Sequence, residues 1–192
     1  MSTTQPIKDK QDLKKFMEYY QKVRPHPRNH AMIVFGLHTA LRISDILKLK
    51  WKMVYDFNEK SFRNHLYLLE QKTGKESIIA LNPHVIQSLE CYFQQRNADS
   101  DDYIFTKTTN FQSPLSRSQA FRIIKRAADA SVHASNISCH SLRKTFGYHA
   151  WKQGTPPALL MDIYNHSSYA ITKKYLGISQ DERDSIFMGM DF

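Results

Sequence analysis

His140 and Arg143 are the first residues whose types and spacing could do chemistry, because they lie three positions apart in His140-Ser141-Leu142-Arg143. In a helix, positions i and i+3 share a face, so an imidazole and a guanidinium would project together. Such a pair can bind a phosphate, since Arg grips two oxygens in a fork and His donates or transfers a proton. A solvated helix face would show the same spacing, so the pair alone is weak evidence.

Arg42 stands between an apolar helix predicted over 29–39 and a short amphipathic helix predicted over 43–50. An Arg at such a junction is often buried or half-buried and then needs an anionic partner. A structural ion pair, for instance with Asp45, is the alternative to a functional role. Both interpretations stay open at this point.

His166 and Tyr175 are nine positions apart, with His166 in a predicted loop and Tyr175 in a short helix predicted over 169–176. A loop histidine can bind an anion, a metal or nothing. A phenol with its ordinary pKa of about 10 is a poor nucleophile unless positive charge surrounds it. Lys173 and Lys174 lie beside the tyrosine, although a tyrosine at such a place is usually a packing residue.

The charge of the chain favours a polyanionic partner. Lys plus Arg number 27 and Asp plus Glu number 18, which gives a net charge of +9. Nucleic acid is the first partner that this charge suggests and an anionic membrane surface the second, although many basic proteins bind nothing acidic. The charge does not distinguish DNA from RNA.

Several classes of protein are excluded by the cysteine and apolar patterns. Cys91 and Cys139 are the only cysteines, so a disulfide scaffold and a four-cysteine zinc site are excluded. The histidines make no zinc motif, so no metal is expected. No run of about 18 apolar residues could cross a membrane, and the first five residues hold no apolar signal region. We therefore expect an intracellular protein without a membrane span.

The elements that must position these residues are mostly helices. Besides those already named, helices are predicted over these ranges: 9–23, 83–96, 116–130, 140–153, 157–164 and 181–192. Short strands are predicted over three ranges: 54–57, 65–70 and 77–81. A hairpin turn over 71–75 joins the last two strands. The chain is predicted to be an α+β domain, mostly α-helical, with one small antiparallel three-stranded sheet.

Taken in order, the segments resemble the catalytic domain of the tyrosine recombinases, also called the phage integrase family. The family pattern is Arg, Lys on a β-hairpin, His-x-x-Arg, a His or Trp, and then the Tyr nucleophile. The matching segments here are ALRISDILKLKW, QKTGKE, HSLRKTFGYH and NHSSYAITKKYLG, and PLSRSQAFRIIKRAA matches the helix ahead of the central box. The resemblance implies this catalytic set: Arg42, Lys72, His140, Arg143, His166 and Tyr175.

The resemblance covers about residues 9–180, and two positions depart from the family pattern. Asn165 replaces the usual Gly, but Asn tolerates left-handed backbone better than most residues. Ser141 replaces a usually acidic residue, which changes the support expected for Arg143. Most members carry a separate N-terminal DNA-binding domain, for which this chain has no room. We expect one catalytic domain over 1–192, either part of a longer protein or a short member like the fimbrial phase-switch recombinases.

The resemblance implies site-specific DNA recombination through a 3′-phosphotyrosine intermediate. Tyr175 would attack phosphorus, while Arg42, Arg143 and His166 stabilise the doubly anionic centre. The phosphotyrosine bond conserves the energy of the diester, so no ATP is required. The cations can replace a metal, and no cofactor is expected.

Proton transfers in this scheme leave alternatives. Lys72 would protonate the departing 5′ oxygen, and Lys75 is its competitor. His140 would assist proton transfer to or from the nucleophile. Tyr164 and Tyr169 compete for the nucleophile's role, but they lack the spacing from the second histidine that the family shows.

Basic residues outside this set are expected to contact the phosphate backbone of double-stranded DNA, although a solvated basic face would look the same. They are Arg117, Arg122, Lys125, Arg126, Lys173 and Lys174. We expect tetramers on paired DNA sites and monomers or dimers when free. The apolar tail over 181–192 would be exchanged between neighbours, or would fold back on its own core.

The cellular setting implied is the cytoplasm of a prokaryote, at the nucleoid, with the gene on the chromosome, a phage or a mobile element. The alternatives are a catalytically silent DNA-binding or regulatory member of the same fold, a topoisomerase-like enzyme of the same chemical class, and an RNA-binding or membrane-surface basic domain. An RNA-binding or membrane-surface domain would explain the charge, but it would not explain why the motifs occur in this order.

Overall fold

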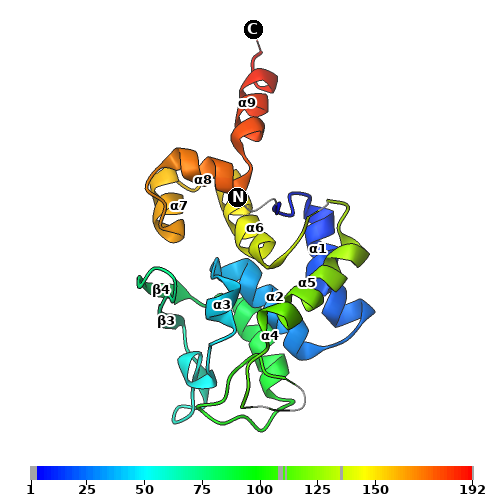
Figure 1. Ribbon diagram of the computed structural model, residues 1–192, viewed down its shortest axis with the longest axis vertical. Coiled ribbons are helices and arrows are strands. Elements are labelled where there is room, and N and C mark those ends of the chain that lie inside the picture. The colour runs from blue at the N-terminus through cyan, green and yellow to red at the C-terminus, as the bar shows by residue number, and fades with distance from the viewer. Residues whose placement is uncertain (1–3, 108–109, 111, 135, 192) are drawn as a thin grey trace.

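Helices make up most of the computed structural model, which describes residues 4–107, 110, 112–134 and 136–191 (Figure 1). Residues 1–3 of the N-terminal stretch and residue 192 of the tail predicted over 181–192 lie outside the described part. The α-helices are α1 Lys10–Glu18, α2 Pro27–Thr39, α3 Ile43–Ile46, α4 Pro83–Phe93, α5 Arg117–Ser131, α6 Cys139–Lys152, α7 Pro157–Tyr164, α8 Tyr169–Leu176 and α9 Ser179–Met188. A π-helical turn, Tyr19–Val23, continues α1, and a 3₁₀ turn, Trp51–Met53, follows α3. The predicted mostly helical α+β fold is confirmed.

The strands that the structure describes form two antiparallel pairs instead of one three-stranded sheet. β1 (Tyr55–Asp56) pairs with β2 (Ser61–Phe62), a strand that the sequence analysis did not predict. β3 (His65–Leu69) pairs with β4 (Glu76–Ala80) as the predicted hairpin. The first pair closes locally, because the Asp56 carboxylate accepts two backbone N–H groups of the turn that follows it. In the described residues no ladder joins this pair to the β3–β4 hairpin.

The ends of two helices differ from those that the spacing of apolar residues predicts. α2 begins at Pro27, two residues earlier than predicted, because proline fits the first turn of a helix. The helix predicted over 43–50 is α-helical only over Ile43–Ile46. α2 is deeply buried in the main hydrophobic core.

A second, smaller core joins α6, α7 and α8. Its buried members are Tyr148, Leu160, Tyr164, Leu176 and Ile178. α9 leaves this core and projects away from the rest of the chain (Figure 1). Within α9, all of which the structure describes, no residue is buried, and Phe187 is 76% exposed.

No helix in the described part of the chain combines the length and the apolar character that a membrane crossing requires.

Candidate active site

Arg42 enters the site from the N-terminus of α3 and is held by a carboxylate. Its guanidinium pairs with Glu70 at the end of β3, which is 5% exposed at its side chain, while Arg42 is 18% exposed. Glu70 also accepts hydrogen bonds from Ser77 Oγ (3.0 Å) and Thr73 Oγ1 (3.3 Å). Asp45, the partner named above as an example, instead accepts a backbone N–H of the hairpin turn at 3.1 Å. The ion pair therefore ties Arg42 to the hairpin, on the side of the cleft described below.

Arg143 is buried on α6 and is held by neutral groups. Its guanidinium donates to the carbonyl of Ala40 and to that of Ile163 (3.4 Å), and it lies 4.6 Å from the centre of the Tyr164 ring. Tyr164 in turn donates to the Arg143 carbonyl at 2.7 Å. Ala40 ends α2 with a left-handed backbone (φ 55°), which is uncommon for a residue with a Cβ. Because carbonyls and a ring orient the guanidinium, its positive charge remains available to a phosphate.

Tyr175 lies half-buried on α8 against two aromatic rings. Its ring centre is 5.2 Å from that of His166, edge-on at 74°, and 5.3 Å from that of Tyr164. Burial raises the pKa of Tyr175, while the positive charges of Arg143 and Arg42 act in the opposite direction. The phenol is thus protonated at neutral pH and lies within the field of both guanidinium groups.

His166 follows a left-handed residue, as the departure at Asn165 allowed. Asn165 has φ 53° and ends α7. The His166 ring stacks on Tyr164 at 5.6 Å, and its Nδ1 lies 3.1 Å from Thr172 Oγ1. Burial lowers the pKa of His166, and the charges of Arg143 and Arg42 lower it further. The imidazole is therefore neutral at pH 7.

His140 lies in the first turn of α6 and lines the cleft described below. Burial of its ring lowers the pKa of His140, and four neighbouring cations add to this effect. They are Lys144, Arg143, Arg42 and Lys72. Ser141, the second departure from the family pattern, is used to cap α6, where its Oγ accepts the backbone N–H of Ser138 at 3.0 Å.

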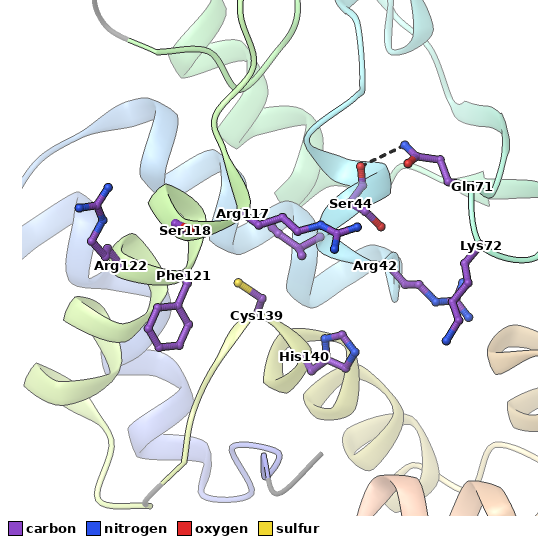
Figure 2. A pocket seen from close by; sticks show the side chains of 11 residues that line it. Arg42, Ser44, Gln71, Lys72, Arg117, Ser118, Phe121, Arg122, Cys139 and His140 are labelled. Atoms are coloured by element: carbon purple, nitrogen blue, oxygen red, sulfur yellow. Dashed lines mark hydrogen bonds between the residues drawn. The ribbon is translucent and has the colours of Figure 1, made fainter. Parts of the chain in front are cut away.

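A basic cleft of about 970 Å³ opens beside these groups (Figure 2). It is lined by Arg42, Ile43, Ser44, Gln71, Lys72, Arg117, Ser118, Phe121, Arg122, Cys139 and His140. Among the described residues no Asp or Glu lines it. In the view of Figure 2, Arg42 and Lys72 lie toward one end of the cleft, Arg122 lies toward the other, and His140 lies between them. A cleft lined by cations with no carboxylate attracts a polyanion.

The two hairpin lysines have different surroundings. Lys75 donates to the Asp162 carbonyl (2.8 Å) and carboxylate (2.7 Å). Lys72 is exposed and faces the cleft beside Arg42. The geometry thus favours Lys72 over Lys75 for a role at a bound phosphate.

The six residues of the predicted catalytic set form one cluster with two parts. Arg42, Lys72 and His140 line the cleft, whereas Arg143, His166 and Tyr175 are not among its lining residues, and Tyr175 packs against the second core. The charges of Arg42 and Arg143 act on both parts.

The basic residues predicted to bind DNA are more scattered. Arg117 and Arg122 line the cleft, and Arg126 lies exposed farther along α5. Lys125 pairs with Asp129 at 2.5 Å, and Lys173 pairs with Glu182 at 3.1 Å. Lys174 is exposed on α8.

Sequence reasoning missed three residues that contact the set: Glu70, Tyr164 and Lys144. Glu70 ends a predicted strand, and nothing in its sequence context marks an ion pair. Tyr164 was considered only as a competing nucleophile, whereas it orients Arg143. Lys144 lies 5.1 Å from the centre of the Tyr175 ring. Within the described residues no group of three or more His, Cys, Asp or Glu side chains could hold a metal.

Comparison with known proteins identifies the family. The phage integrase family pattern matches residues 8–182. The probable integrase/recombinase YoeC of Bacillus subtilis is 36% identical over 181 residues, which cover 94% of this chain and 93% of that protein. The type 1 fimbriae regulatory protein FimE of Escherichia coli is 28% identical over 155 residues, covering 77% and 73%.

Solved structures show the same fold. XerA recombinase superposes with a TM-score of 0.76 at 18% identity, and the match covers all of this chain and 66% of that one. The recombinase XerH, bound to a palindromic difH substrate in a post-cleavage complex, gives 0.72 at 20% identity, covering 98% and 54%. This chain therefore spans between half and two thirds of the length of these recombinases.

The chain belongs to the phage integrase family. The predicted fold class and the predicted function as a tyrosine-type site-specific recombinase are confirmed at the level of the family.

Proposed function

We propose that this chain cleaves and rejoins double-stranded DNA with Tyr175 as the nucleophile. The observation that carries the proposal is that the Tyr175 ring lies against His166 and in the field of Arg143 and Arg42. A buried phenol is unreactive alone, because burial favours its protonated form. Two guanidinium groups whose charges both act on the phenol supply the charge that a pentacoordinate phosphorane needs.

The chemistry balances without a further reactant. The Tyr175 Oη forms a bond to phosphorus, and the bond from phosphorus to the 5′ oxygen breaks, which leaves a 3′-phosphotyrosine. Lys72 gives a proton to the leaving oxygen. His140, which is neutral at pH 7, assists the transfer of the proton that the phenol loses. Attack by a 5′ hydroxyl of a partner strand reverses these steps.

Arg42 gains a second anionic partner in this scheme. In the structure its charge is balanced by Glu70, while Arg143 donates to the carbonyls of Ala40 and Ile163. A phosphate bound between the two guanidinium groups would add a second anion to Arg42 and would also bind Arg143. Because Glu70 stays bound to its hairpin hydroxyls, it would hold Arg42 in place during the reaction.

The assembly that we propose is a tetramer on two paired DNA sites, formed by single catalytic domains that are monomers or dimers when free. The exposed apolar side chains of α9, Ile186 and Phe187, support exchange of this helix with a neighbour. The difH complex of XerH and a lambda integrase dimer bound to a COC′ core site support DNA as the partner. Arg117, Arg122, Lys125, Arg126, Lys173 and Lys174 would contact the backbone. We place the protein in the cytoplasm, at the nucleoid.

The test uses nicked duplexes with a randomised central stretch. The nick traps the covalent intermediate because the short cleaved strand diffuses away. Duplexes that stay bound in SDS are recovered and amplified over several rounds. We expect the wild-type protein to enrich a duplex to which Tyr175→Phe binds without forming an adduct, while Tyr169→Phe, on the same helix, still forms it. Binding without any adduct would identify a catalytically silent DNA-binding protein and refute the proposal.

A further inference from the structure

The segment before α1, residues 4–8, is called the strap here, and it packs on the helix that carries Arg143. The Ile7 backbone N–H donates to Thr145 Oγ1 at 2.9 Å, and the Ile7 carbonyl lies 2.9 Å from His149 Nε2. The Ile7 side chain is buried in the main core. These contacts fix the strap along α6, although the two segments lie far apart in the sequence.

Lys8 joins the strap to the end of the helix that carries Tyr175. Its Nζ donates to the carbonyl of Gly177 at 3.1 Å and to the Asp181 carboxylate at 2.8 Å. Gly177 ends α8 with a left-handed backbone, two residues after the phenol, and Asp181 lies in the first turn of α9. Lys8 therefore holds the junction at which α9 leaves the nucleophile's helix.

Lys144 joins the strap to the phenol ring itself. This residue is 5% exposed, its Nζ donates to the Thr4 carbonyl at 2.5 Å, and it lies 5.1 Å from the centre of the Tyr175 ring. An ammonium over an aromatic face is attracted by the quadrupole of the ring, and more strongly where both are removed from water. The strap thus holds a cation against the face of the nucleophile, on α6 directly after Arg143.

We propose that Lys144 is a positioning residue for the Tyr175 nucleophile and that the strap holds its ammonium in place. The proposal rests on the function proposed above for Tyr175. Lys144 lies over the Tyr175 ring and does not line the basic cleft, so the role assigned to it is to orient the phenol. Orientation matters here because a misplacement of about 1 Å at a reacting atom can lower a rate on the order of 100-fold.

The first test compares Lys144→Met, which removes the charge and shortens the unbranched side chain by one atom, with Lys144→Arg, which keeps a cation. Lys22→Met is the matched control, because it removes one positive charge from an exposed pair with Glu18. The selected nicked duplex gives the single-turnover rate of adduct formation, and the intact duplex gives the Kd. We expect Lys144→Met to slow adduct formation at least about tenfold, while its Kd for the intact duplex equals that of Lys22→Met. We expect Lys144→Arg to recover most of the rate. A wild-type rate in Lys144→Met, or no recovery by Lys144→Arg, would overturn the proposal.

A second test needs no DNA, so it separates this proposal from the proposed function. Amide hydrogen exchange in α8 reports local opening of the helix. We expect faster exchange in Lys144→Met and in Lys8→Met, whose side chain is 39% exposed and therefore tolerant of change. We expect no change in Lys22→Met. Unchanged exchange in both strap variants would refute the positioning role, even if Tyr175 forms an adduct.

Discussion

Replacing Glu70 by Gln tests how Arg42 is held. Gln keeps the shape of the side chain and can still accept the hydrogen bonds from Ser77 and Thr73, so the change removes mainly the charge. Breaking a buried ion pair by removing one partner destabilises a protein by about 3–5 kcal/mol. Because Arg42 is 18% exposed, solvent screens part of the loss, and we expect the lower end, about 3 kcal/mol. For a chain of this size that lowers Tm by roughly 6–12 °C.

The assay for Glu70→Gln is urea denaturation followed by circular dichroism, together with a thermal scan. The control is Asp101→Asn, which also removes a carboxylate, in this case one that contacts Lys50 and Lys52 at the surface. We expect no measurable change in that control. If Glu70→Gln were as stable as Asp101→Asn, Arg42 would not depend on Glu70, and the account of how the hairpin positions it would fail.

Three further predictions concern the hairpin lysines, the packing of α6 against α7, and a histidine of α2. Lys72→Met should abolish most adduct formation with little loss of stability, whereas Lys75→Met should retain it; equal rates in single-turnover assays would contradict the assignment. Gly147→Ala should destabilise the protein by about 1–3 kcal/mol in urea denaturation, because an added Cβ would clash with the Tyr164 hydroxyl; wild-type stability would show that α6 and α7 are less tightly packed. Burial lowers the pKa of His30, so protonation disfavours the folded state. Stability should therefore fall as the pH drops below about 6.5, the unfolded value, and His30→Gln should flatten this slope; an identical slope would refute the burial.

The order of the chemistry-bearing segments was enough to predict the family, because each segment keeps its residue types and its place in the chain. The helical period of apolar residues located most helices, since an apolar stripe such as that of α5 packs on the core. The predicted three-stranded sheet was wrong because β1 pairs with the nearby β2. Strands of two residues are too short to show an alternating pattern in the sequence.

The partners of the site residues could not be predicted from the sequence. Glu70 and Arg42 are 28 positions apart, and Thr4 and Lys144 are 140 apart, so only the fold brings each pair together. The same holds for Arg143, whose carbonyl acceptors belong to backbone groups that carry no residue-type signal. The choice between Lys72 and Lys75 likewise depended on where Asp162 lies in space.

The central claim is that the Tyr175 oxygen forms the bond to DNA, and mass spectrometry of the trapped adduct tests it most directly. The wild-type protein is incubated with the selected nicked duplex, the DNA is digested to a short remnant, and the peptides are sequenced. The account predicts a nucleotide 3′-phosphate on Tyr175 and a free 5′ hydroxyl on the released strand. A remnant on Tyr164 or Tyr169, or one attached through a 5′ phosphate, would contradict it.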